Sequence, residues 1–125
     1  MRIQLETGGQ SNQIRTYAAG QIIVNQDSYN RSLVVLPGQV IADWPPQAFE
    51  ELALAHLAAL VTLSPELVIL GTGRRQRFPR AELLAPLVEA GLGWEVMDTG
   101  AACRTYNILM SEGRNVAAAL LMIEG

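Results

Sequence analysis

The chain of 125 residues contains no lysine, so arginine supplies all nine of its basic side chains. This absence excludes Schiff-base chemistry and a phosphate-binding P-loop, because both depend on a lysine amine. A single cysteine, Cys103, excludes an intramolecular disulfide and a metal site built from several cysteines. His56 is the only histidine, and the carboxylates show no spacing typical of a metal site. We therefore expect no cofactor and no metal.

Long apolar segments and an excess of positive charge are also missing. Glu50, Glu51 and His56 divide the longest apolar candidate, so no segment approaches the roughly 20 apolar residues of a membrane span. Residues 1–6 lack the apolar run of a secretory signal. The formal net charge of −3 argues against general nucleic-acid binding, which needs positive charge to neutralise phosphates. We expect a soluble cytoplasmic protein with no nucleic-acid partner.

Hydrophobic residues make up 50% of the chain and charged residues 17%, which is a globular composition. The length suits one domain, and we predict a single domain over residues 1–125. The first third of the chain favours short strands joined by turns. Residues 14–17 and 21–25 flank a turn signal at 18–20, and residues 33–36 and 40–43 flank another at 37–39. This pattern predicts an N-terminal β-rich portion.

From Trp44 onward, the pattern predicts helices that alternate with strands. Three helices are expected: one beginning at Pro45 and Pro46 and ended by Ser64-Pro65, one following Pro79, and one from Thr99 or Gly100 to Gly113. Residues from Phe49 to Leu60 give the first helix an apolar face, and a stripe that includes Val88 marks the second. Strands are expected at residues 67–70, 94–97 and 116–123. The alternation predicts an α/β fold with a mixed, mostly parallel sheet flanked by helices.

The candidate site begins where the apolar run of residues 67–70 ends. Four apolar residues without alternation are typical of a strand buried on both faces, and ligands in such sheets bind where the strands end. The next residues are Gly71, Thr72, Gly73, Arg74, Arg75, Gln76 and Arg77. If the strand at residues 94–97 is a parallel neighbour, its following loop, residues 98–104, faces this one. We therefore predict that Asp98 and Thr99 lie beside the glycine-rich loop.

Two interpretations of the arginine loop remain open. The guanidinium groups of Arg74, Arg75 and Arg77 suit a small anion such as a phosphate or a carboxylate. Alternatively, Arg74 or Arg75 pairs with Asp98 or Glu95 and holds the two loops together. A dinucleotide site matches poorly, because a glutamine replaces the third glycine of the usual fingerprint.

The third predicted helix carries two different faces. Thr99 is expected to cap it, with Asp98 near its positive end. Arg104 and Asn107 lie opposite Cys103, and their face is either a polar partner surface or an ordinary solvated one. We expect Cys103 to be a buried, inert thiol. Tyr106 is expected on that inner face, and His56 is expected to be a hydrogen-bonded helix residue, so no catalytic residue is predicted.

Several segments together resemble a known protein family. They are Met97 to Asn107, Ser111-Glu112-Gly113-Arg114, Gly71-Thr72-Gly73, Arg77-Phe78-Pro79, Ser32-Leu33 and Asp43-Trp44. The pattern is similar to a widespread family of small uncharacterised proteins that includes a mitochondrial complex I assembly factor and an adipogenesis-associated protein of animals. The resemblance covers nearly the whole chain and implies a compact three-layer fold, assistance to a partner's assembly in at least one member, and no established enzymatic activity. Without a mitochondrial targeting extension, the chain looks like a short bacterial member.

Together these observations favour a non-catalytic interaction or assembly-accessory protein with an unknown protein partner. The alternative is a small anion- or nucleotide-binding protein that uses residues 71–77.

Overall fold

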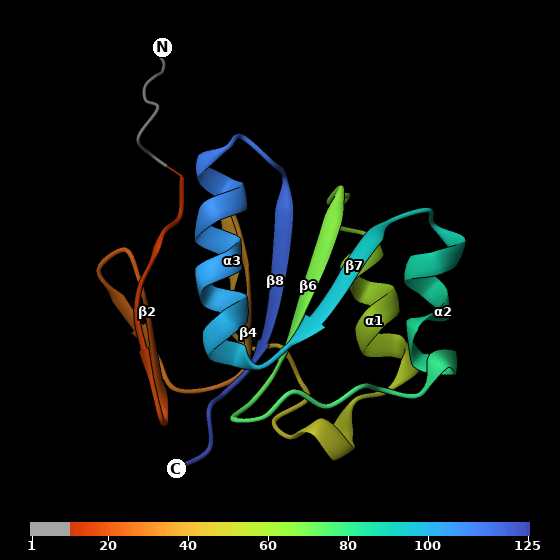
Figure 1. Cartoon of the computed structure of the whole chain (residues 1–125), viewed down its shortest axis with the longest axis horizontal. Helices are drawn as coiled ribbons and strands as arrows, with labels where there is room; N and C mark the ends of the chain where they lie inside the picture. The colour runs from red at the N-terminus through yellow and green to blue at the C-terminus, as the bar shows by residue number, and fades with distance from the viewer. Residues whose placement is uncertain (1–10) are drawn as a thin grey trace.

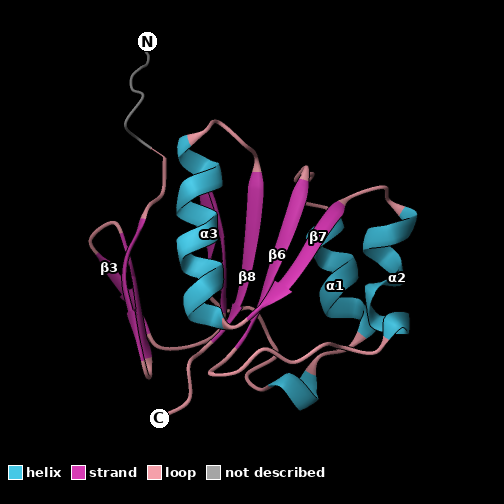
Figure 2. Ribbon diagram, viewed as in Figure 1, coloured by secondary structure: helices cyan, strands magenta, loops and turns pink. Residues whose placement is uncertain are grey.

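The computed structural model describes residues 11–125, whose chain forms two β-sheets and three α-helices (Figures 1 and 2). The predictions for residues 1–6 lie outside this part. The first sheet contains β1 (Ile14–Ala18), β2 (Gln21–Val24) and β3 (Asp27–Tyr29), paired antiparallel in that order. The first two strands confirm the predicted hairpin. The third was not predicted, and it follows a tight turn in which Asn25 adopts a φ of 55°, a conformation that asparagine tolerates.

The second sheet has five strands in the order β5-β4-β8-β6-β7. Its strands are β4 (Leu33–Leu36), β5 (Gln39–Ile41), β6 (Leu67–Thr72), β7 (Gly93–Met97) and β8 (Val116–Leu121). The strand β6 pairs parallel with β7 and with β8, whereas β4 pairs antiparallel with β5 and with β8. The predicted mixed sheet is therefore present, with its parallel half at β8-β6-β7. The second predicted hairpin is β4 with β5.

The five-stranded sheet is the middle of three layers. Its central strands alternate between two apolar clusters, because successive side chains point to opposite faces. Val68 and Ala117 face the helices α1 (Leu54–Val61) and α2 (Ala81–Glu89). Ile69 and Ala118 face α3 (Thr99–Ser111) and the small sheet, which Figure 1 shows on the opposite side. Every residue of β8 is buried, as expected for a strand covered on both faces.

The prediction of one continuous first helix is wrong, because the structure has two separate helical segments there. A short 3-10 helix, η1 (Phe49–Glu51), precedes α1, and the chain is extended between them at Leu52 and Ala53. Leu52 is 7% exposed, so the break turns its side chain into the core. His56 Nδ1 accepts a hydrogen bond of 3.0 Å from the Ala53 amide and caps the second segment. The prediction of a hydrogen-bonded histidine is confirmed.

Two smaller expectations also differ from the structure. Val88 is 60% exposed and lies outside the buried stripe of α2, which is formed by Leu84 and Leu87. The last strand ends at Leu121 rather than at residue 123. The third helix begins and ends as predicted, and Gly113 follows it with a φ of 84°, as is common just after a helix.

Candidate functional site

The glycine-rich loop and the start of α3 meet at the carboxyl edge of β6 and β7. The Thr99 amide donates to the Gly73 carbonyl at 2.9 Å, and the Gly73 amide donates to Thr99 Oγ1 at 2.8 Å. The two strands are parallel and paired from Leu67 with Gly93 to Gly71 with Met97. The predicted convergence of these two loops is therefore present.

Asp98 lies at the positive end of α3 as predicted, but it also takes the capping role that was predicted for Thr99. Asp98 is the N-cap of α3, because its Oδ1 accepts from the Ala101 amide at 2.9 Å. Thr99 is fully buried and its hydroxyl donates to the Leu121 carbonyl at 2.6 Å. The expectation that Thr99 caps the helix is wrong, because Asp98 is the last extended residue and reaches the free amides first. Thr99 instead joins β8 to the loop after β6.

The two glycines of the loop allow its close approach to neighbouring elements. A Cβ at Gly71 would lie 2.9 Å from Thr99 Oγ1. Gly73 has a φ of 93°, and a Cβ there would collide with the carboxylate of Glu124. Gly71 therefore leaves room for Thr99, and Gly73 adopts a backbone conformation that favours glycine.

Side-chain hydrogen bonds hold the rest of the loop in one conformation. The Thr72 hydroxyl donates to the Arg75 carbonyl at 2.6 Å and accepts from the Arg77 amide at 3.1 Å. Gln76 Nε2 donates to the Val96 carbonyl of β7 at 2.9 Å. These bonds hold the turn together internally and against β7. They therefore fix the backbone from which the following exposed side chains extend.

The arginines of the loop have different surroundings. Arg77 Nη1 lies 2.9 Å from Glu50 Oε2, and its guanidinium stacks 4.2 Å from the centre of the Phe49 ring. A backbone hydrogen bond and the Arg77 guanidinium lower the pKa of the Glu50 carboxyl. Arg74 and Arg75 are exposed, and among residues 11–125 neither forms an ion pair. The predicted pairing with Asp98 or Glu95 is therefore absent there.

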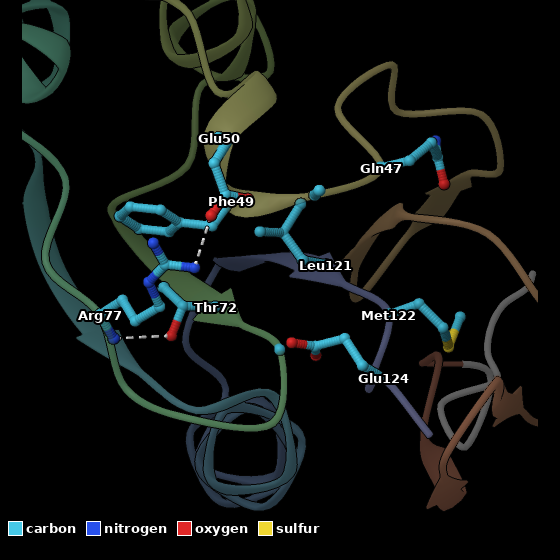
Figure 3. A pocket seen from close by; sticks show the side chains of 10 residues that line it. Gln47, Phe49, Glu50, Thr72, Arg77, Leu121, Met122 and Glu124 are labelled. Carbon is cyan, nitrogen blue, oxygen red and sulfur yellow. Dashed lines mark hydrogen bonds and ion pairs between the residues drawn. The ribbon is translucent and has the colours of Figure 1, made fainter.

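A carboxylate from the end of the chain lies on the same loop. Glu124 Oε1 accepts a hydrogen bond of 2.7 Å from the Arg74 amide. Figure 3 shows Glu124 across the hollow from Arg77 and Thr72, and all three residues line it. The backbone of the arginine loop thus already binds one anionic oxygen, and that oxygen is supplied by the chain itself.

Two hollows flank the pair formed by Arg77 and Glu50. We name them by one residue each, the Glu124 hollow of about 220 Å³ and the Phe78 hollow of about 350 Å³. The Glu124 hollow is lined by Gln47, Ala48, Phe49, Glu50, Thr72, Gly73, Arg77, Leu121, Met122 and Glu124 (Figure 3). The Phe78 hollow is lined by Phe49, Glu50, Leu52, Arg77, Phe78, Pro79, Arg80 and Leu83. Phe49, Glu50 and Arg77 line both, so the stacked ion pair is their common wall.

The outer residues of α3 bind to the small sheet. Asn107 Oδ1 accepts from the Ile14 amide at 2.9 Å, and its Nδ2 donates to the Ile14 carbonyl at 2.7 Å. Arg104 donates to the Tyr17 hydroxyl and lies 5.7 Å from the centre of that ring. Both side chains therefore hold α3 against β1, and they lie on the other side of the central sheet from the Phe78 hollow.

Cys103 and His56 are separated by the central sheet. Cys103 is fully buried on the α3 side, and burial raises the pKa of its thiol to about 12. His56 belongs to α1, which covers the other face. The two side chains therefore do not meet, and the expectation of a buried thiol is confirmed.

The sequence did not point to Glu50, Phe49 or Glu124 as parts of this region. Glu50 is 27 residues from Arg77, and Glu124 is 50 residues from Arg74. The spacing of residues within one helix or strand does not indicate contacts between residues so far apart in the chain. Phe78, between Arg77 and Pro79, is 65% exposed, but a single exposed apolar residue is ordinary, so its position in the sequence gave no signal of a hollow.

In the described part of the chain, no three histidine, cysteine or carboxylate side chains gather as a metal site would need. The helices found there are too short or too polar to cross a bilayer.

The fold is a three-layer mixed α/β domain with a glycine-arginine loop at the carboxyl edge of its parallel strands, and known proteins share it. A crystal structure of a protein from Bordetella parapertussis superimposes with a TM-score of 0.84 at 42% identity, over 90% of this chain and 96% of that one. Residues 14–121 match the family described as "Protein of unknown function (DUF498/DUF598)". The chain belongs to this family, which confirms the resemblance seen in the sequence.

Two relatives carry names of their own. The "13 kDa major membrane protein" of Francisella tularensis is 30% identical over 108 residues, which are 86% of this chain and 88% of that protein. "NADH dehydrogenase (ubiquinone) 1 alpha subcomplex assembly factor 3" of Xenopus tropicalis is 34% identical over 110 residues. That match covers 86% of this chain but 60% of the assembly factor, so the chain spans about three fifths of that relative's length.

Proposed function

We propose that this protein is a non-catalytic, cytoplasmic assembly-accessory protein that acts by binding another protein. The observation that carries the proposal is the state of the side chains at the converging loops. Thr72, Asp98 and Thr99, which would be the polar groups of an active site, are bound to backbone atoms. The side chains left exposed there include Phe78, Arg74 and Arg75, and aromatic and arginine side chains are typical of protein-binding surfaces.

The relatives support the same function. One relative is named as an assembly factor, and its similarity extends over 86% of this chain, including both loops of the candidate site. An assembly factor acts through contacts with other proteins, which agrees with an exposed aromatic side chain beside a hollow.

Affinity purification followed by a genetic test examines this proposal. The chain would be tagged at its natural expression level, cross-linked in its host, and purified beside a tag-only control. We expect one protein to be recovered in a fixed ratio, and we expect the complex that contains it to decrease on native gels when the gene is deleted. Recovery of no protein above the control would contradict the proposal, as would a recovered protein whose assembly is unchanged in the deletion strain.

The second candidate function, binding of a small anion at residues 71–77, is favoured by one observation. The Arg74 amide already binds a carboxylate oxygen of Glu124, so the loop accepts an anionic oxygen. The exposed Arg74 and Arg75 side chains would add charge to such a site. In this arrangement, a free anion or a nucleotide phosphate must displace Glu124.

Thermal unfolding with inorganic phosphate, sulfate or AMP tests this candidate. A ligand that binds only the folded state raises the stability, by about 2.7 kcal/mol at one hundred times its Kd. We expect a saturable rise in Tm that is lost in Arg74→Ala and Arg75→Ala, retained in the control Arg15→Ala, and larger in Glu124→Ala. If no anion raises the Tm of either the wild type or Glu124→Ala, the loop is purely structural.

A further inference from the structure

We propose that the Phe78 hollow is the partner-binding site, and that its occupant is an acidic protein segment that carries a large apolar side chain. This inference rests on the proposed function and names the chemistry of the partner. The hollow encloses about 350 Å³ between η1, the arginine loop and the start of α2. Small-ligand pockets occupy about 300–1000 Å³, so this volume suits one or two side chains better than a large cofactor.

The floor of the hollow is apolar, and one aromatic side chain remains exposed beside it. Phe49, Leu52 and Leu83 line it, and Phe78 is 65% exposed at its edge. A single exposed apolar residue is ordinary, but an exposed aromatic ring adjoining an apolar hollow provides a place where a partner side chain loses its contact with water. An apolar side chain of the partner would bury both surfaces together.

The backbone around Phe78 is held in place before any partner binds. The preceding residue, Arg77, donates its amide to Thr72 Oγ1, and the following residue, Pro79, is buried. The Arg77 side chain is fixed by Glu50 and by the Phe49 ring. A surface that is already ordered loses little conformational entropy on binding, and this favours a specific contact.

The charge around the hollow selects the partner. The charged residues that line the hollow are Glu50, Arg77 and Arg80. Arg80 is exposed, and within residues 11–125 it takes part in no ion pair. Two more acidic residues, Glu51 and Glu82, are exposed and adjoin lining residues in the chain, and Glu124 belongs to the Glu124 hollow. Glu50 is paired with Arg77, and Glu124 is bound to the Arg74 amide. The lining of the hollow therefore keeps one positive charge outside any ion pair, that of Arg80, although the chain as a whole has a net charge of −3. A carboxylate of the partner is complementary to this charge.

A protein segment fits these features better than a nucleic acid or a lipid surface. Nucleic acid would need a broad basic face, but the overall charge is negative and the basic residues that line the hollow are Arg77 and Arg80. An anionic membrane would need no apolar hollow for one side chain. A short acidic segment with one aromatic or branched residue uses both the charge and the hollow.

Peptide selection on the whole protein tests the inference. A phage library of random 12-residue peptides would be selected on the immobilised chain, and enriched peptides would be synthesised and measured by fluorescence anisotropy. We expect enriched peptides to be acidic with at least one large apolar residue. Phe78→Ala and Arg80→Ala should each weaken their binding about tenfold or more.

The matched control variants are Val88→Ala and Arg15→Ala. Val88 is 60% exposed on α2 and Arg15 is exposed on β1, and neither lines the hollow. We expect both to bind the peptides as the wild type does. All four substitutions replace exposed side chains, and an unchanged Tm would verify that each variant is folded. Any of three results overturns the inference: no enrichment, enrichment of basic or uncharged peptides, or binding that Phe78→Ala and Arg80→Ala leave unchanged.

Two further measurements separate this inference from the function on which it rests. If the affinity purification recovers a partner equally well with wild type and Phe78→Ala, the assembly role stands and the site is wrong. If no partner is recovered while acidic peptides still require Phe78 and Arg80, the assembly role is contradicted and the site stands. Binding to phosphatidylserine vesicles that requires these residues, without any peptide binding, would assign the surface to lipid and overturn the inference.

Discussion

The two faces of the five-stranded sheet are covered by helices that are held in different ways (Figure 2). On one face, polar side chains of α3 bind the backbone of distant segments: Thr99 binds Leu121, Asn107 binds Ile14, and Tyr106 binds Asn12. These partners are 22 to 94 residues apart in the chain. On the other face, α1 and α2 pack through Leu57, Leu60, Leu84 and Leu87. Among the described residues, no side-chain hydrogen bond runs from α1 or α2 to the sheet.

This difference distinguishes the face that stabilises the fold from the edge at which we propose that a partner binds. Directional hydrogen bonds permit one arrangement of α3, and the face beneath it contains the fully buried Cys103 and Tyr106. Apolar packing is not directional, and the edge of the α1–α2 face contains the Phe78 hollow and exposed Phe78. We infer that the α3 face maintains the fold while the opposite edge remains available to a partner.

The largest expected effect concerns the burial of the α3 face. Cys103 should react with a neutral thiol reagent at pH 8 at least about a thousandfold more slowly than an exposed cysteine. Its pKa of about 12, against the ordinary 9.0, leaves about a thousandfold less thiolate, and burial blocks access as well. The control is Cys103→Ala combined with Ile108→Cys, because Ile108 is 58% exposed on the same helix. Native rates within tenfold of each other would mean that α3 does not seal this face.

The next effect measures what the directional bonds contribute to stability. Thr99→Val keeps the shape of the side chain but leaves the Gly73 amide and the Leu121 carbonyl without their partner. Each buried group without a hydrogen bond costs about 1–3 kcal/mol, so we expect urea unfolding to show a loss of about 2–6 kcal/mol for the two groups together. Thr62→Val is the matched control, since Thr62 is exposed and bonds only to Ala59 nearby. Similar losses in both variants would contradict the assigned role of Thr99.

A smaller loss of stability is expected from a substitution at Gly73, in the loop that follows β6. Gly73→Val should reduce the free energy of unfolding by about 1–3 kcal/mol, the usual cost of placing such a residue in a rare backbone region. Two controls divide the cause. Gly113→Val keeps the positive φ with open space around the Cβ, and Gly38→Val has open space without a positive φ. An unchanged Tm for Gly73→Val would remove the argument that this loop needs a special backbone.

Much of the architecture could be read from local patterns. The alternation of helices and strands after Trp44 predicted the parallel half of the sheet, and with it the meeting of Gly73 and Thr99. Periodicity succeeds here because β6 and β8 contain no charged residue and most of the connections carry a glycine or a proline. The break between η1 and α1 was missed, because the apolar spacing continues across Leu52 although the backbone does not.

The contacts of the candidate site were less predictable, for a physical reason. The partner of Arg77 is Glu50, and the group on the Arg74 amide is Glu124, and both come from segments far away in the chain. Sequence spacing reports neighbours within one element, but it does not report which loops a fold brings together. The loop itself could be predicted, whereas the ion pair and the two hollows required the structure.

The smallest expected effect lies at the wall between the two hollows, where Glu50→Gln releases Arg77. A backbone hydrogen bond and then the Arg77 guanidinium lower the pKa of Glu50 from its ordinary 4.5 in the folded state, so these contacts together stabilise the protein above that pH. The stability difference between wild type and Glu50→Gln should therefore be small at pH 7 and vanish as the pH falls below the lowered pKa, because both states then bind the proton. Urea unfolding from neutral to acidic pH measures this difference.

Glu66→Gln is the control, since Glu66 is also exposed, and Arg114 lowers its pKa at a site away from both hollows. The two variants should behave alike in stability, whereas only Glu50→Gln should strengthen binding of acidic peptides, because it frees a positive charge beside Phe78. Equal peptide affinities for both variants would show that the charge of Arg77 does not contribute to peptide binding at the Phe78 hollow. The proposal that this edge binds acidic partners through its positive charge would then be contradicted.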